Sequence, residues 1–321
     1  MLDISLNELK NAEFVLPEKN PILKPFDRSF VVADPSLLTP DNCHDGKWHM
    51  FFHTTFGVYH FDSPDGISFR NAGKVCSRAM RPNINYIDGK YYLFYEKTRS
   101  LFANALNVAG LAGWYSEIYC RESDDLYNFG AEYPVIRHTK DFEASKKCVA
   151  LSNPFLFYEG GVYRLWYSCA QTYIKDCGFS EPTYINYAES TDISSGYVTN
   201  ANPVISPDAD NPYLNLCSGC IKVYKLKDAY AALQNGIYER DGHSHSAIML
   251  LSSQDGVHFT HEKILIEPGM YENAGWMQQY VYASHMVRYG NELRIYFNAR
   301  NVSDMLRGRE CIGYVTDTNL R

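Results

Sequence analysis

The sequence contains no long apolar run and no cluster of basic residues, and each of these absences excludes a class of protein. No stretch approaches the roughly 20 apolar residues that a helix needs to cross a bilayer. The formal net charge is -7, so we expect neither nucleic acid nor an anionic membrane as a partner. The first 14 residues are polar and acidic, which is unlike a secretion signal.

Disulfide-like cysteine pairing is also missing, because nine cysteines make an odd number and lie scattered along the chain. Such a set is typical of reduced, mostly buried thiols and predicts a cytoplasmic protein. Cys217 and Cys220 form a single C-x-x-C pair with no second pair and no βαβ pattern around it. Buried thiols are therefore favoured over a zinc or redox site. No cofactor is indicated, and a metal ion bound inside the fold stays an open alternative.

Aromatic residues are abundant, at 15% of the chain, and they favour strands over helices. The stretch DGKYYLFYEKT at 88–98 recurs in variant form four times, at 45–55, 159–169, 226–236 and 289–299. Each copy joins a polar turn to an aromatic and aliphatic run, and a second strand-like run follows it. Five such units of about four strands predict an all-β, five-bladed β-propeller, forming a single domain over residues 1–321. A β-sandwich does not explain this fivefold period.

The fifth unit lacks an outer strand, and the N-terminal segment is predicted to supply it. The outer strands of the second and third units end as YPVI and NPVI, and the segment before the first unit contains NPIL at 20–23. Closure of the ring in this way removes exposed sheet edges, which promote aggregation.

In a propeller the starts of the innermost strands converge on the central channel, so polar residues there are candidates for a site. This first set consists of Asp34, Arg81, Asn83, Asn153, Ser218, Cys220, Ser284 and His285. The ends of the second strands give another set, which consists of His53, Glu96, Ser168, Asn235 and Asn298.

At these positions the chain resembles the five-bladed glycoside hydrolases of families 43 and 32. The resemblance rests on Ala33-Asp34-Pro35, on the DGKYYLFY repeat and on strands such as SSQDG. It implies that Asp34 acts as base or nucleophile. Other family carboxylates are unmatched: family 43 has Asp-Pro opening the third blade and Glu-Gly-Pro opening the fourth. This chain has Asn153-Pro154 and Ser218-Gly219-Cys220 there. Family 32 has Arg-Asp-Pro opening the second blade, where this chain reads Arg81-Pro82-Asn83.

Glycoside hydrolysis ordinarily needs a second carboxyl group as general acid, and Glu96 is the first candidate because it ends a strongly apolar strand. The alternative is a structural ion pair of Glu96 with Lys97 or Arg99. His285 is the other candidate acid, since in some related propeller glycosidases a histidine replaces the carboxylic acid. Its alternatives are a metal or water ligand in the channel, as in family 43, and a purely structural histidine.

Further residues are predicted to bind substrate. Arg81 is suited to an anionic group, and Asn83 and Asn153 to hydroxyl groups. The aromatic faces of Trp114, beside an insertion at 101–114, and of Trp276 are suited to stacking on a sugar. The remaining predicted contacts are His53, Glu117 and Gln278.

The sequence thus predicts a glycoside hydrolase-like enzyme that acts on a small-molecule carbohydrate. Two alternatives stay open: a non-hydrolytic relative, such as a glycan or natural-product transferase, and a sugar-binding propeller without catalysis.

Overall fold

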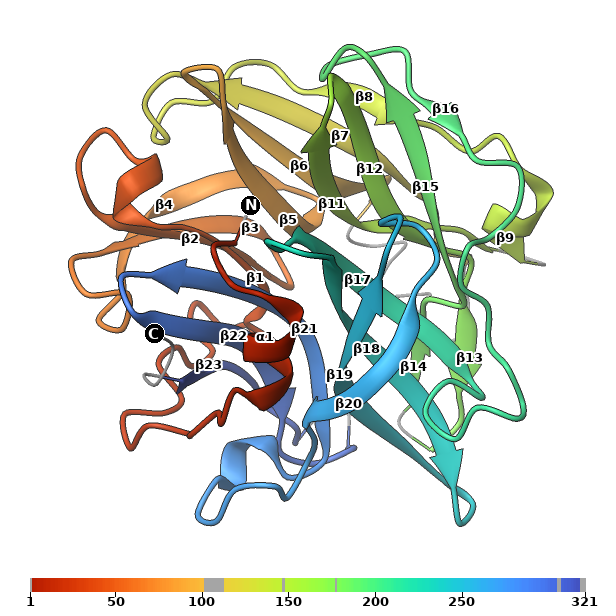
Figure 1. Cartoon of the computed structure of the whole chain (residues 1–321). Helices are drawn as coiled ribbons and strands as arrows, with labels where there is room; N and C mark the ends of the chain where they lie inside the picture. Colours follow the sequence, from red (N-terminus) through yellow and green to blue (C-terminus); the bar gives the residue numbers. More distant parts are fainter. Residues whose placement is uncertain (1, 101–112, 146–147, 177, 305–306, 318–321) are drawn as a thin grey trace.

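The computed structural model describes residues 2–100, 113–145, 148–176, 178–304 and 307–317, and its strands form five small sheets in a ring (Figure 1). Four of these sheets have four antiparallel strands, and the fifth has three. The first strand of each sheet contacts the first strand of both neighbouring sheets, so these strands surround the central channel. The predicted five-bladed β-propeller is confirmed.

The strands of the first three blades follow chain order from the channel outward. Blade 1 consists of β1 (Ala33–Leu38), β2 (Trp48–Thr54), β3 (Gly57–Ser63) and β4 (Arg70–Ser77). Blade 2 consists of β5 (Ala79–Ile87), β6 (Lys90–Thr98), β7 (Ser116–Ser123) and β8 (Tyr133–Ile136). Blade 3 consists of β11 (Leu151–Glu159), β12 (Val162–Cys169), β15 (Tyr184–Ser190) and β16 (Val198–Thr199). The predicted insertion at 101–114 lies outside the described residues except for its last two.

The last two blades complete the ring. Blade 4 consists of β17 (Cys217–Lys225), β18 (Tyr230–Arg240), β19 (His243–Ser253) and β20 (Thr260–Ile266). Blade 5 consists of β21 (Tyr280–Tyr289), β22 (Glu292–Arg300) and β23 (Glu310–Asp317). Short elements lie outside the blades: α1 (Leu6–Asn11), η1 (Pro40–Asn42), η2 (Asp141–Glu143), β9 (Ala144–Ser145), β10 (Cys148–Val149), β13 (Thr172–Ile174), β14 (Phe179–Glu181) and η3 (Gly275–Met277).

Blade 3 differs from the prediction at its outer edge. The sequence indicated an outer strand at 202–205, whereas β16 is a two-residue strand four positions earlier. Ile205 adds only a separate bridge to Ile185 of β15.

The N-terminal segment closes the ring along β23, as predicted. Main-chain hydrogen bonds join Leu23 and Ile312 in both directions, at 3.0 and 2.9 Å. Between this bridge and a second one at Val15 and Thr316, the segment contacts β23 through a side chain. The amide of Asn20 donates to the main-chain oxygen of Tyr314 at 3.0 Å and accepts from its main-chain N–H at 3.0 Å. The ring is therefore closed partly by backbone pairing and partly by the Asn20 side chain, which makes the two hydrogen bonds that a paired strand would make.

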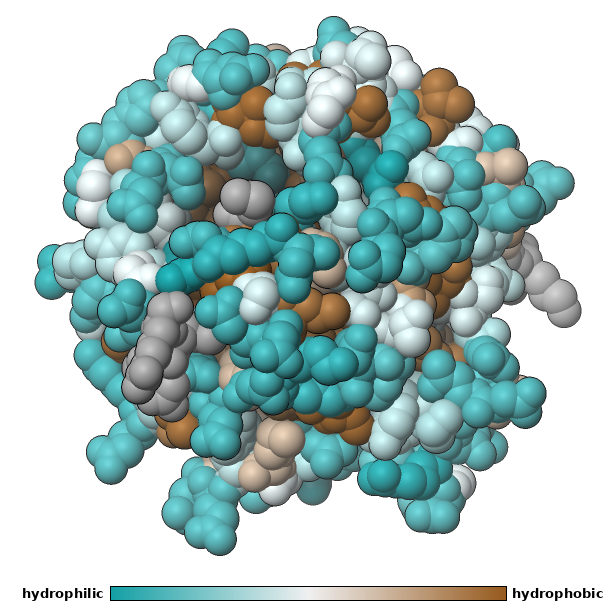
Figure 2. Space-filling view, viewed as in Figure 1, coloured by the Kyte–Doolittle hydropathy of each residue, from teal (hydrophilic) through white to brown (hydrophobic). Residues whose placement is uncertain are grey.

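The same segment then crosses one end of the channel, on the face shown in Figures 1 and 2. The main-chain N–H of Leu2 donates to the main-chain oxygen of Lys225 at 2.8 Å, and the carboxylate of Asp3 forms an ion pair with Lys227 at 3.2 Å. Hydrophilic residues cover most of this face, and its apolar residues form small, separate patches (Figure 2). Among the described residues, no helix is long and apolar enough to cross a membrane.

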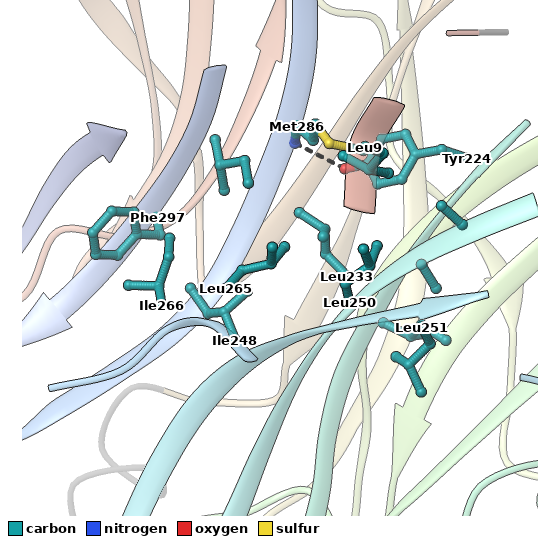
Figure 3. Close-up of a cluster of buried hydrophobic side chains, with 14 of the residues drawn as sticks. Leu9, Tyr224, Leu233, Ile248, Leu250, Leu251, Leu265, Ile266, Met286 and Phe297 are labelled. Carbon is teal, nitrogen blue, oxygen red and sulfur yellow. Dashed lines mark hydrogen bonds between the residues drawn. The ribbon is translucent and has the colours of Figure 1, made fainter. Parts of the chain in front are cut away.

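Hydrophobic packing between blades forms the core. The largest cluster joins blades 3, 4 and 5 with α1, whose Leu9 is fully buried. Figure 3 shows Leu9 beside Tyr224 and Met286, near the leucines of β18 and β19. Trp48 and Trp166, predicted to be core residues, are 1% and 0% exposed.

Side chains link the innermost strands to one another across the blade boundaries. An innermost strand has no strand on its channel side, so its backbone N–H groups there need other acceptors. In four of the five boundaries, a side chain on one innermost strand accepts the N–H of the next strand at 2.9–3.0 Å. These contacts are Ser36 with Ile84, Asn83 with Leu156, Tyr224 with Met286 (dashed in Figure 3) and His285 with Leu37.

Removal of one acceptor tests this ring of contacts. In Tyr224→Phe the aromatic packing remains, but the buried N–H of Met286 loses its partner. We expect a loss of about 1–3 kcal/mol in the free energy of unfolding, measured by urea denaturation. The control is Tyr158→Phe, since Tyr158 is 49% exposed and should leave stability unchanged. Equal stability of the two variants would contradict this role for Tyr224.

Candidate active site

The five innermost strands all carry a bulge at the same place, at the end of the channel opposite α1. Each register shift spans two residues near the start of the strand, at 34–35, 81–82, 153–154, 218–219 and 282–283. Asp34, Arg81 and Asn153 adopt positive φ values of 54°, 52° and 50° there. Such a conformation costs on the order of 1–3 kcal/mol in a residue other than glycine and is concentrated at functional sites. The predicted first set thus includes three strained, polar residues.

Side chains at the ends of the second strands hold these bulges, which brings the two predicted sets together. The oxygen of Asn298 accepts the main-chain N–H of Asp34 at 3.1 Å. The hydroxyl of Ser168 donates to the main-chain oxygen of Gly219 at 2.7 Å. His53 has a double contact, because its Nδ1 lies 3.3 Å from both Asp34 Oδ2 and the main-chain nitrogen of Arg81. Burial lowers the pKa of His53 to about 4, so its ring is neutral at physiological pH.

Glu96 is fully buried and forms an ion pair with Arg81, in direct hydrogen-bonding contact. The indole N–H of Trp114 donates to the other carboxylate oxygen of Glu96 at 2.9 Å. The ion-pair alternative for Glu96 therefore has a different partner from the two that the sequence suggested. Lys97 pairs instead with Glu132 at 2.7 Å, and the guanidinium of Arg99 lies over the ring of Tyr115. Glu96 thus holds the side chain of Arg81, and Trp114 holds Glu96.

His285 lies deeper in the channel than Asp34. Its Nδ1 accepts the N–H of Leu37, and burial lowers its pKa to about 3. The ring borders a cavity of about 800 Å³ at the α1 end of the channel, lined also by Phe155 and Tyr224. An imidazole that serves as an acceptor and stays neutral suits the structural alternative for His285 better than an acid role.

Three further predicted substrate contacts lie in blades 2 and 3. Asn83 and Asn153 are 1% and 4% exposed beside the channel, but the oxygen of Asn83 is already engaged by Leu156. Glu117, on the third strand of blade 2, accepts from Tyr115 at 3.0 Å.

Trp276 and Gln278 lie in and directly after η3, just before β21. Trp276 packs on Phe297 of β22, with ring centroids 5.4 Å apart, and lies against Gly313 of β23. Gln278 follows on the exposed side of η3. Substrate binding by Trp276 and Gln278 stays a prediction.

Two carboxyl groups that the sequence analysis did not single out belong to the site. Burial raises the pKa of Glu181, at the end of β14, to about 7, and it raises that of Glu310, at the start of β23, also to about 7. The positive charge of Arg81 opposes this effect on the pKa of Glu181, and that of Arg300 opposes it on Glu310, whereas the negative charge of Asp34 raises both pKa values. All three carboxyl groups therefore lie within electrostatic reach of one another. Glu310 is held by Asn298, and its other oxygen lies 3.9 Å from Arg300. Glu181 makes no side-chain hydrogen bond or ion pair with the described residues.

The lengths of the connections between second and third strands could have pointed to Glu181 and Glu310. Second strands end at the rim where innermost strands begin, because neighbours in a blade are antiparallel. In blades 1 and 4 only two residues join the second strand to the third, whereas blade 3 uses 170–183 and blade 5 uses 301–309. Glu181 lies in the first of these long connections, and Glu310 directly follows the second.

The chemistry of the site is that of carboxyl groups. Within the described part of the chain, no three histidine, cysteine or carboxylate side chains are grouped to hold a metal ion. Cys220 lies at the site, but burial raises the pKa of its thiol to about 12, whereas a redox or metal-binding cysteine needs a lowered pKa.

No protein-family model matches the chain, and no curated protein matches its sequence. Solved structures match nearly its whole length. An N-acetylgalactosamine deacetylase from F. plautii, in complex with blood group B trisaccharide, has a TM-score of 0.66 at 13% identity, over 96% of this chain and 95% of that one. A family 117 glycoside hydrolase from Zobellia galactanivorans has a TM-score of 0.61 at 16% identity, over 96% and 90%. A glycosyl hydrolase from Bacteroides ovatus has 0.66 at 14%, over 99% and 97%.

At this level of identity the similarity shows the fold alone. Glycoside hydrolases are among these structural neighbours, so the predicted resemblance to propeller glycoside hydrolases holds for the architecture. The specific resemblance to families 43 and 32 stays a prediction.

The raised pKa values predict a pH-dependent stability. A glutamate with a folded pKa of about 7 and an ordinary value of 4.5 holds its proton in the folded state where the unfolded chain has lost it. Its stabilising contribution is therefore complete below about pH 4.5 and is lost as the pH rises through 7. We expect Glu310→Gln to reduce the loss of stability between pH 5 and pH 8 by on the order of 2–3 kcal/mol, measured by urea denaturation at both pH values. The exposed Glu18 gives the control, Glu18→Gln, and an identical pH dependence in both variants would contradict the assignment.

Proposed function

We propose that this protein is a glycoside hydrolase whose substrate enters the bulge end of the channel, with Asp34 as base and Glu181 as general acid. The observation that carries the proposal is an unpartnered carboxyl group of pKa about 7, within electrostatic reach of a second carboxylate. Two such groups in different environments are what the hydrolysis of a glycosidic bond requires. The structural neighbours that are glycoside hydrolases support the proposal at the level of fold.

Each residue has a role that follows from its surroundings. Asp34 is fixed by Asn298 through its backbone and lies beside the neutral ring of His53, so its carboxylate is positioned to accept a proton from water. A carboxyl group with a pKa near 7 retains a proton at neutral pH and gives it up readily to a leaving oxygen. Glu181 has that pKa, and no other described side chain occupies its carboxyl group.

Glu181 replaces the two acids suggested by the sequence. The carboxylate of Glu96 is occupied on both oxygens, by Arg81 and Trp114. Protonation of His285 would break its contact with Leu37. We therefore assign Glu96 to positioning Arg81, and His285 to holding β1.

The leaving group of the substrate tests the assignment of the acid. With aryl glycosides, we expect Asp34→Asn to lower kcat/KM by roughly 10²–10⁴-fold for every leaving group. Glu181→Gln should lower it by a similar factor for a poor leaving group such as phenol, and by much less for 2,4-dinitrophenol, which departs without protonation. The readout is steady-state release of the phenol across a panel of sugars.

Glu132→Gln is the control, since Glu132 pairs with Lys97 on the flank of blade 2 and should leave kcat/KM unchanged. A uniform loss in Glu181→Gln across leaving groups would exclude it as the acid. If no glycoside is turned over by the wild-type chain, hydrolysis itself is excluded. Binding of an intact oligosaccharide without products would then favour the sugar-binding alternative.

A further inference from the structure

Lys222, on the innermost strand of blade 4, is a buried cation with no counter-ion. The residue is 5% exposed, and within the described residues its ammonium group forms no hydrogen bond and no ion pair. Its ammonium group makes a cation–π contact with the ring of Phe155, 5.2 Å from the centroid. The other buried cations among the described residues contrast with it, because Arg294 and Arg300 each lie near a carboxylate.

A lone buried ammonium group is costly, since burial removes its hydration and nothing replaces it. The pKa of Lys222 is lowered accordingly, with burial as the main cause. A ligand that carries a negative charge would supply the missing partner. Lys222 therefore marks a place in the channel that is complete only when an anion occupies it.

The position of Lys222 connects it to the proposed active site. The charge of Asp34 partly offsets the effect of burial on the pKa of Lys222, so the two groups interact across the channel. Lys222 also interacts electrostatically with Cys220, which directly follows the bulge of the same strand, and with His285 deeper in the channel. Its charge is therefore within electrostatic reach of the proposed active site.

We propose that the substrate carries an oxyanion, a carboxylate or a sulfate on the sugar, and that Lys222 binds it. This inference rests on the proposed function, because it names the class of sugar that the same site takes. Carboxylate and sulfate oxygens accept hydrogen bonds from ammonium groups, and bonds to charged groups are the stronger ones. Neutral sugars would leave the ammonium group unpaired and bind more weakly.

Binding to the full chain tests the proposal without any need for turnover. We would titrate matched pairs by calorimetry: glucose with glucuronate, galactose with galacturonate, and galactose with galactose 6-sulfate. At least one acidic sugar should bind roughly 10- to 100-fold more tightly than its neutral partner, the size expected for a hydrogen bond to a charged group. The uronate and sulfate arms distinguish the two sources of the oxyanion.

Lys222→Met should abolish this preference and leave neutral sugars bound as before. Without ligand it should also raise Tm, because it replaces an unpaired buried charge by an apolar side chain of similar length. The control is Lys225→Met, three residues along the same strand, where the lysine is solvated and paired with Glu159; it should retain the preference.

Equal binding within every pair, or no binding at all, would overturn the proposal. A preference for acidic sugars that survives in Lys222→Met, or a fall in Tm, would overturn it too. Either result would show that Lys222 is not an unpaired cation that binds an anionic ligand. If neutral aryl glycosides are hydrolysed while acidic sugars show no preference, the proposed function stands and this inference fails.

Discussion

The open backbone edge of each innermost strand is the constraint on which this propeller depends. A strand that borders the channel has a pairing partner on one side only, and burial makes unpaired N–H groups on the other side costly. The chain meets this need with side chains from the preceding blade, through Ser36, Asn83, Tyr224 and His285. At the boundary between blades 3 and 4, the corresponding position is Phe155, which has no acceptor. Lys222 lies over that ring, so the one apolar position in the ring of acceptors also accommodates the unpaired cation.

The same constraint explains where the reactive groups gather. Bulges near the start of the innermost strands turn Asp34, Arg81 and Asn153 out of the regular ladder. The side chains that secure those bulges, His53 and Asn298, are then unavoidably close to Asp34, the proposed base. Scaffold and site share residues here, which is common where backbone strain is stored for function.

Much of this arrangement could be predicted from sequence, because strand periodicity and turn residues are local signals. The five units, the closing role of residues 20–23 and the positions of Asp34 and Arg81 all follow from the repeat. The proposed acid does not, because Glu181 lies in a hairpin outside the repeat. His285 was assigned correctly to the channel, but depth along the channel depends on the bulge, which adds a residue without any mark in the sequence. The partner of Glu96 was missed for a related reason, since Arg81 lies across the strand pair while Lys97 and Arg99 are merely adjacent in sequence.

Ring closure through the N-terminal segment has a consequence for biosynthesis. The segment that pairs with β23 precedes blade 1 in the chain, whereas β23 is part of blade 5, so the four blades between them must be made before the two can meet. Until then blade 5 is incomplete, and an unpaired strand edge is exposed during synthesis. Early blades can pair their own strands as they emerge, since each is local in sequence, but the circle itself is a late event. The segment before blade 1 therefore stays without its partner strand until β23 has been made.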